Sequence, residues 1–180
     1  MYDDIYRGFV SIEEGQIHYR TCGSDNNPPL VMLHGSPLSS YAIRGLISTF
    51  GKKFKVYAPD TIGNGDSCKQ GTKKVTIKYL ADAMLRAMKN LNLNEFYLYG
   101  FHTGGNIGIE AAIKSPEIVK KLIIDGLGLY SNEYKEKLFK NQAPEIYPDM
   151  EGTQFTKAWH LIRDGKIFWP WWNRSEDGSR

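Results

Sequence analysis

The sequence is poor in cysteine and in long apolar runs, and each shortage excludes a class of protein. Its 180 residues include two cysteines, Cys22 and Cys68, which lie far apart and form no C-x-x-C pair. A disulfide framework or a zinc site therefore has little support, and a reducing compartment is expected. No apolar run approaches the length that crosses a bilayer, and the N-terminal stretch lacks the apolar core of a signal peptide. We expect a cytoplasmic protein with no membrane partner.

The positively charged residues are also too sparse for a nucleic-acid-binding protein. The formal net charge is +3, and the basic residues are scattered in ones and twos instead of forming a dense stripe. The four histidines form no H-x-H or H-E-x-x-H pair, so we predict no metal and no cofactor. The remaining composition, 41% hydrophobic and 24% charged, is typical of a globular chain that can bury one core.

Apolar runs alternate with helical patterns along most of the chain. Six runs predict strands: Phe9 to Glu13, Gln16 to Thr21, Leu30 to Leu33, Lys55 to Pro59, Phe96 to Tyr99 and Val119 to Asp125. Helical spacing begins at Ser39 or Ser40, runs again from Val75 to Leu91, and continues in N-I-G-I-E-A-A-I after the glycine-rich turn. The first two strands form a hairpin at one edge. Strands that alternate with helices favour parallel βαβ units. The predicted fold class is therefore α/β, with a mostly parallel sheet and helices on both faces.

The composition changes beyond Gly126. Glu133 to Lys140 predicts a charged helix, a further amphipathic helix includes Trp159, and all four tryptophans follow residue 158. We interpret residues 1–129 as the core and residues 130–180 as a helical cap or lid. A tryptophan-rich cap favours a closed apolar pocket over a peptide groove, with Trp159 and Trp169 as candidate lining residues.

The stretch Glu95 to Gly105 reads E-F-Y-L-Y-G-F-H-T-G-G and indicates a strand, a sharp turn and a helix. In the nucleophile-elbow pattern G-x-S-x-G, glycines flank the reactive residue because the turn brings backbone close to strand and helix. Gly100 and Gly104 fit these flanking positions. The central position, where a Ser, Cys or Asp normally lies, is His102.

Three motifs together resemble the α/β-hydrolase superfamily: L-V-M-L-H-G-S-P, A-P-D-T-I-G-N-G-D-S and Y-G-F-H-T-G-G, in this order and spacing. The resemblance runs from about Phe9 to Asp125 and more loosely into the cap. It implies the fold more specifically than a reaction, because this fold hosts esterases, lactonases, epoxide hydrolases, dehalogenases, lyases, cofactor-free oxygenases and non-catalytic members.

The resemblance also implies roles for the loops. The backbone amides of Ser36 and Thr103 are expected to form the oxyanion hole. His34 and Gly35 are expected to be structural, with His34 bracing the loop. The segment that begins at Asp60 is expected to form a glycine-rich turn.

Three interpretations of His102 remain open. Its imidazole could act as a general base on water or as a nucleophile. It could orient a ligand without covalent chemistry, or it could fill the pocket of a protein that has lost catalysis. Asp125, at the end of the last predicted strand, is the acid that could orient His102, although a turn residue at the cap junction is the simpler interpretation.

The family pattern requires a histidine after the elbow and two further strands after the cap, and the chain stops at Arg180. We therefore expect a fragment of a longer protein. The alternatives are a cap that folds back and a second chain, as in a dimer, that completes the sheet. The expected function is hydrolysis of a small carbonyl substrate, either an ester or lactone-like. The alternatives are a non-catalytic ligand-binding or interaction protein, a cofactor-free oxygenase or lyase, and an inactive fragment.

Overall fold

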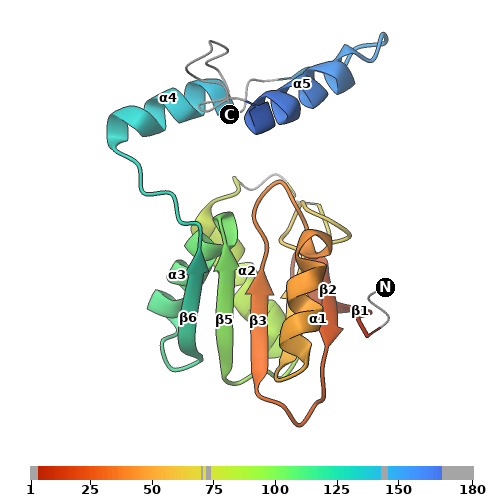
Figure 1. Ribbon diagram of the computed structural model, residues 1–180, viewed down its shortest axis with the longest axis vertical. Coiled ribbons are helices and arrows are strands. Elements are labelled where there is room, and N and C mark those ends of the chain that lie inside the picture. Colours follow the sequence, from red (N-terminus) through yellow and green to blue (C-terminus); the bar gives the residue numbers. More distant parts are fainter. Residues whose placement is uncertain (1–3, 70, 72–73, 143–145, 168–180) are drawn as a thin grey trace. The chain divides into compact units, whose positions relative to one another are not determined.

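The computed structural model describes residues 4–69, 71, 74–142 and 146–167. The chain divides into two units, Met1–Gly128 and Leu129–Arg180. The first unit contains one six-stranded sheet with helices on both of its faces (Figure 1). The division lies next to the boundary that the composition predicts between residues 129 and 130.

The sheet is mixed and mostly parallel. Its strands are β1 (Tyr6–Ile12), β2 (Gly15–Cys22), β3 (Pro29–Leu33), β4 (Lys55–Pro59), β5 (Phe96–Phe101) and β6 (Val119–Asp125). They lie in the order β1-β2-β4-β3-β5-β6. The strands β4, β3, β5 and β6 run parallel to one another, whereas β1 and β2 form an antiparallel hairpin that pairs with β4. This arrangement confirms the predicted fold class.

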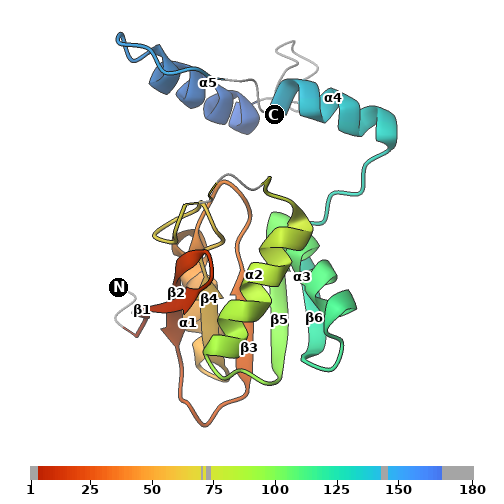
Figure 2. The ribbon, with the colours of Figure 1, turned by 180° about the vertical axis from the view of Figure 1, so that it is seen from behind.

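Different helices cover the two faces of the sheet. The 3-10 helix η1 (Ser40–Ile43) and α1 (Arg44–Gly51) lie on one face, whereas α2 (Ile77–Asn90) and α3 (Thr103–Lys114) lie on the other (Figures 1 and 2). The side chains of Ser39 and Thr76 cap η1 and α2 by accepting the amides of Tyr41 and Tyr79. Polar residues before each amphipathic segment therefore mark where these helices begin.

Strand β3 contributes side chains to the apolar cores on both faces of the sheet. Val31 and Leu33 belong to the apolar cluster on the α2 and α3 face, whereas Leu30 and Met32 belong to the cluster on the α1 face. All four are buried. Because successive side chains of a strand point to opposite faces, a strand covered on both sides is apolar throughout. The uninterrupted apolar run in the sequence thus places β3 in the centre of the sheet.

The second unit contains the predicted helices α4 (Asn132–Gln142) and α5 (Thr153–Ile167). In α5, Phe155, Trp159 and Ile162 are more than half exposed. The described part of this unit therefore leaves the apolar stripe of α5 uncovered. No helix among the described residues combines the length and apolar character needed to cross a membrane.

Candidate active site

The turn between β5 and α3 has the sharp geometry that the glycine pattern predicts. His102 is the single residue between the strand, which ends at Phe101, and the helix, which begins at Thr103. Its backbone has φ 51° and ψ −113°, outside the regions that residues other than glycine commonly adopt. The amide of Gly105 donates to the His102 carbonyl at 2.9 Å, and the His102 side chain is exposed. The turn thus presents the imidazole at the carboxyl end of the sheet.

Two glycines permit this turn because backbone approaches backbone there. A Cβ added to Gly100 would lie 2.4 Å from the carbonyl oxygen of Gly104. A Cβ added to Gly104 would lie 2.4 Å from the carbonyl oxygen of Leu33, at the end of β3. Both contacts are far closer than a side chain allows, so α3 begins directly against β3 and β5.

The loop after β3 lies beside the elbow. A Cβ added to Gly35 would lie 3.0 Å from the Cβ of His102, so the two turns are in contact. Ser36 follows in an exposed turn that the Leu38 amide closes by donating to the Gly35 carbonyl at 2.9 Å. Thr103 is the first residue of α3, where a backbone amide lacks an acceptor within the helix. The two predicted oxyanion residues therefore lie on adjacent segments, Ser36 in the loop after β3 and Thr103 at the start of α3.

Asp125 meets His102 through its main chain, whereas its side chain has another partner. The Asp125 carbonyl accepts the His102 amide at 2.8 Å. The carboxylate oxygen Oδ2 of Asp125 instead accepts the hydroxyl of Tyr99 at 2.5 Å. Burial and this bond raise the pKa of Tyr99 to about 12. The sequence analysis did not identify Tyr99. Phe101 is the register partner of Asp125, and Tyr99 lies two residues before Phe101. Tyr99 and Asp125 therefore lie on the same face of the sheet, which is the pattern that could have indicated this contact.

His34 joins two loops of the site. Its Nε2 accepts the amide of Thr61 at 3.1 Å, so Nδ1 carries the ring proton and donates to the Gly35 carbonyl at 3.0 Å. The side chain is almost fully buried. Burial lowers the pKa of His34, since a charged ring would lose its hydration and one of these bonds.

We predict that this histidine makes the protein less stable in weak acid. Because the folded-state pKa lies below the value of about 6.5 in the unfolded chain, the unfolded state takes up a proton first as the pH falls. The stability is complete above pH 6.5 and declines below it, by about 1 kcal/mol at pH 5.5. Urea unfolding of wild type and His34→Gln at pH 7.5 and 5.5 measures this loss. Equal losses in the two proteins would contradict the assignment.

Asp60 is buried instead of forming only a turn. Its carboxylate accepts the amide of Ser40 at 2.7 Å and that of Asp66 at 3.0 Å, and it pairs with Nδ1 of His18 at 2.8 Å. His18, Asp60 and Asp66 each offer an atom that could ligate a metal. However, the Arg7 guanidinium donates to Nε2 of His18 and pairs with Asp66. A cation already occupies this position, so we assign no metal there.

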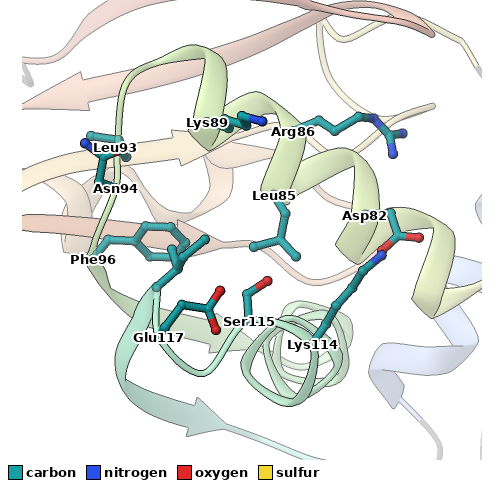
Figure 3. Close-up of a pocket in the computed structure, with 11 residues that line it drawn as sticks. Asp82, Leu85, Arg86, Lys89, Leu93, Asn94, Phe96, Lys114, Ser115 and Glu117 are labelled. Carbon is teal, nitrogen blue, oxygen red and sulfur yellow. The ribbon is translucent and has the colours of Figure 1, made fainter.

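A cavity of about 530 Å³ lies at the opposite end of β5 from His102. Figure 3 shows it between α2 and the segment that follows α3, with Leu85 and Phe96 over its floor and the Lys114 ammonium directed at the Asp82 carboxylate. Because it opens near the amino end of β5, it is separate from the elbow.

The two tryptophans predicted to line a pocket remain predictions. Trp159 lies on α5 with 59% of its surface exposed, and the Arg163 guanidinium lies 5.2 Å from its ring centroid. Trp169 lies outside the described residues.

The comparisons with known proteins agree on one family. Residues 28–158 match the family described as alpha/beta hydrolase fold. The chain is 34% identical over 111 residues to a soluble epoxide hydrolase of Corynebacterium sp. (strain C12), covering 61% of this chain and 37% of that protein. It is 32% identical over 127 residues to the cis-3-alkyl-4-alkyloxetan-2-one decarboxylase of Shewanella oneidensis, covering 69% and 39%. A crystal structure of an N-acyl homoserine lactonase matches with 27% identity and a TM-score of 0.69, over 80% of this chain and 55% of that one.

The chain thus spans less than half the length of the two curated relatives. Their stated reactions differ from each other and from that of the lactonase, so similarity alone does not select a reaction. The matched range covers more than half of the chain and includes all three loops of the candidate site. This chain belongs to the α/β-hydrolase fold family.

Proposed function

We propose that this protein hydrolyses a small ester or lactone-like substrate and that His102 is the reactive group. The observation that carries this proposal is the backbone of His102, whose positive φ at the turn between β5 and α3 presents an exposed imidazole beside Gly35. Strained residues of this kind persist where the surrounding structure enforces them and gather at active sites.

The first route is nucleophilic. A ring nitrogen of His102 adds to the substrate carbonyl carbon, and the electron pair of the C=O bond moves to oxygen. The amides of Ser36 and Thr103 donate to that oxygen, and the N-terminus of α3 favours its negative charge. Collapse of the intermediate expels the alkoxide, which receives the remaining ring proton through a water molecule, and leaves a neutral acyl-imidazole. Water then cleaves the acyl-imidazole to release the acid and restore His102.

The second route uses the same groups without a covalent intermediate. The imidazole takes a proton from a water molecule, the resulting hydroxide adds to the carbonyl carbon, and the imidazolium then protonates the leaving alkoxide. In both routes, Asp125 is proposed to act without a hydrogen bond to the ring: its carbonyl accepts the His102 amide, its carboxylate is held by Tyr99, and its negative charge favours a positively charged ring. Trapping with hydroxylamine separates the routes, because only an acyl-imidazole yields a hydroxamate from the enzyme-bound acyl group.

The substrate class follows from the loops and from the relatives. An oxyanion hole suits a carbonyl oxygen that gains charge, and a lactonase is among the similar structures. The tryptophan-rich composition beyond residue 158 favours a small, partly apolar molecule over a peptide.

We predict that His102→Ala lowers kcat/KM for short aryl esters and lactones roughly 100-fold or more, towards the uncatalysed rate. His102→Gly serves as the folding control. Glycine adopts the observed positive φ without strain, so this variant should gain about 1 kcal/mol of stability while it also loses activity. Initial rates give kcat/KM, and urea unfolding gives the stability, of wild type, His102→Ala and His102→Gly. Equal rates in wild type and His102→Ala would refute the role of His102.

A second candidate is a ligand-binding protein without turnover. One observation favours it: among the described residues, the hydrogen bond of the His102 ring is a long one, 3.4 Å, to the Thr103 hydroxyl, and no carboxylate orients the ring. This candidate predicts saturable binding of an aryl ester, seen as a change in tryptophan fluorescence, with no product formed. A cofactor-free oxygenase or lyase would use the same elbow and loops and would instead form a product other than the hydrolysis acid.

A further inference from the structure

The cavity between α2 and the segment after α3 has the size of a small-molecule site. Its volume is about 530 Å³, and ligand pockets commonly measure about 300–1,000 Å³. Its apolar lining side chains are those of Leu85, Leu93, Phe96 and Ile118. All lining residues fall within residues 82–118, whereas a strand that continued the sheet would be added beyond β6 (Figures 1 and 2). The cavity is therefore a feature of the α2 and α3 layer and not of the sheet edge.

Three of the charged side chains that line this cavity already have partners of opposite charge. The Lys114 ammonium pairs with the Asp82 carboxylate, which joins α3 to α2. The Arg86 guanidinium pairs with Glu14 and with Glu13 in the turn between β1 and β2. Because these charges are neutralised within the protein, they contribute little to the recognition of a charged ligand.

Glu117 provides the unpaired anion of the cavity. Among the residues that the structure describes, its carboxylate has no ion-pair or hydrogen-bond partner. Figure 3 shows the Glu117 carboxylate and the Ser115 hydroxyl on the wall opposite Leu85, with both groups turned toward the cavity. A carboxylate accepts hydrogen bonds only, and a hydroxyl can accept as well as donate. This wall therefore offers two acceptors to a cationic donor.

Two helices also end at the cavity. α2 ends at Asn90 and α3 ends at Lys114, next to Ser115. The C-terminus of a helix carries a partial negative charge that favours cations near its last turn. Lys89, in the last turn of α2, is the cation that opposes this preference. Figure 3 shows the Lys89 ammonium on the α2 wall, across the cavity from Glu117, so its repulsion of a cation beside Glu117 acts over the width of the cavity.

We propose that this cavity binds a primary amine that carries an apolar tail. The ammonium group of the ligand donates to the Glu117 carboxylate and to the Ser115 hydroxyl, and hydrogen bonds between ionised groups are the strong ones. The tail lies against Leu85, Phe96 and Ile118. A carboxylate at the same place would face Glu117 and two helix C-termini, so the site selects against anions. Because the cavity is separate from the elbow, this proposal does not depend on the chemistry of His102.

The test uses hexylammonium as the probe, with hexanoate and hexanol as matched compounds of the same tail length. Each is titrated at pH 7 into the isotopically labelled 180-residue chain, and the backbone amide shifts are followed by NMR. Hexylammonium should shift amides within residues 82–96 and 114–118 and should saturate. The dissociation constant of hexanoate should be at least about tenfold larger, because its charge has the wrong sign for Glu117.

Two variants should change the affinity for hexylammonium in opposite directions. Glu117→Gln keeps the shape of the side chain but removes its charge, so the dissociation constant should rise roughly tenfold. Lys89→Gln removes the opposing cation, so the dissociation constant should fall about threefold. Glu110→Gln is the matched control, because Glu110 lies on α3 outside the lining of this cavity and its loss should leave the affinity unchanged.

The location and the charge preference can each fail. Equal dissociation constants for hexylammonium and hexanoate would overturn the proposal, and so would an unchanged affinity in Glu117→Gln. A second apolar groove of about 460 Å³ lies on the α1 face and is lined by residues that include Phe50, Phe54, Tyr97 and Ile123. Amide shifts confined to these residues would place the amine in that groove and would also overturn the proposal. None of these measurements uses ester hydrolysis, so their failure is distinct from a failure of the proposed function.

Discussion

Gly104→Ala is expected to lower the free energy of unfolding by about 3 kcal/mol, which corresponds to a fall in Tm of about 6–12 °C. The added methyl group would lie 2.4 Å from the carbonyl oxygen of Leu33 and 2.8 Å from that of His34. Neither atom belongs to a flexible side chain, so the start of α3 must move away from β3. Alanine favours a helix over glycine by about 1 kcal/mol, which is too little to offset this overlap.

Thermal unfolding followed by circular dichroism measures the effect. Gly71→Ala is the matched control, because no atom lies within 4 Å of a Cβ added there. A Tm for Gly104→Ala within about 2 °C of the wild type, less than 1 kcal/mol on this scale, would show that the two loops are not packed backbone to backbone. The contact between the elbow and the loop after β3 would then need to be reassigned.

Asp60→Asn is expected to destabilise the protein by about 3–5 kcal/mol at pH 7. The carboxylate is fully buried and receives hydrogen bonds from Ser40, Asp66 and His18. An amide replaces one acceptor oxygen with a donor, so a buried donor faces another donor. Asp66→Asn is the control, because its half-exposed carboxylate pairs with an exposed Arg7 and should contribute less than about 1 kcal/mol.

The Asp60 effect should also depend on pH. Burial alone would raise the pKa of Asp60, but the hydrogen bonds outweigh burial and the pKa is lowered below 3.8. A carboxyl group with a lowered folded-state pKa contributes stability above pH 3.8, and this contribution is lost as the pH falls through the folded-state value. Urea unfolding from pH 7 to pH 3 should therefore show a constant difference between wild type and Asp60→Asn down to about pH 4 and a smaller one below. A difference that does not change down to pH 3 would contradict this origin.

The sequence predicts the elements well where local chemistry decides them. β6 has the predicted bounds of Val119 and Asp125, and the apolar run of β3 identifies a strand buried on both faces. Gly100 and Gly104 predict the sharp turn before α3, because few other arrangements require two glycines at that spacing. These features depend on steric limits and periodicity, which act over a few residues.

The polar contacts were not predictable in the same way. Tyr99 and Asp125 are 26 residues apart, and His18 and Asp60 are 42 apart. Each pair meets only because separate strands lie side by side in the sheet. The sequence leaves Asp125 either as the acid that orients His102 or, more simply, as a turn residue at the cap junction, and the structure pairs its carboxylate with Tyr99. It also suggests a turn at Asp60, whereas the structure buries the carboxylate in a hydrogen-bonded network.

The sequence by itself therefore determined the fold class, the order of strands and helices near the site, and the presence of an imidazole at the elbow. Only the tertiary structure decided which polar groups meet, and that β6 leaves Ile123 and Ile124 at an open edge among the described residues. The physical reason is the distance along the chain over which each property is determined. Backbone conformation and apolar periodicity are properties of neighbouring residues, whereas hydrogen-bond partners, burial of charge and sheet edges depend on how distant segments pack.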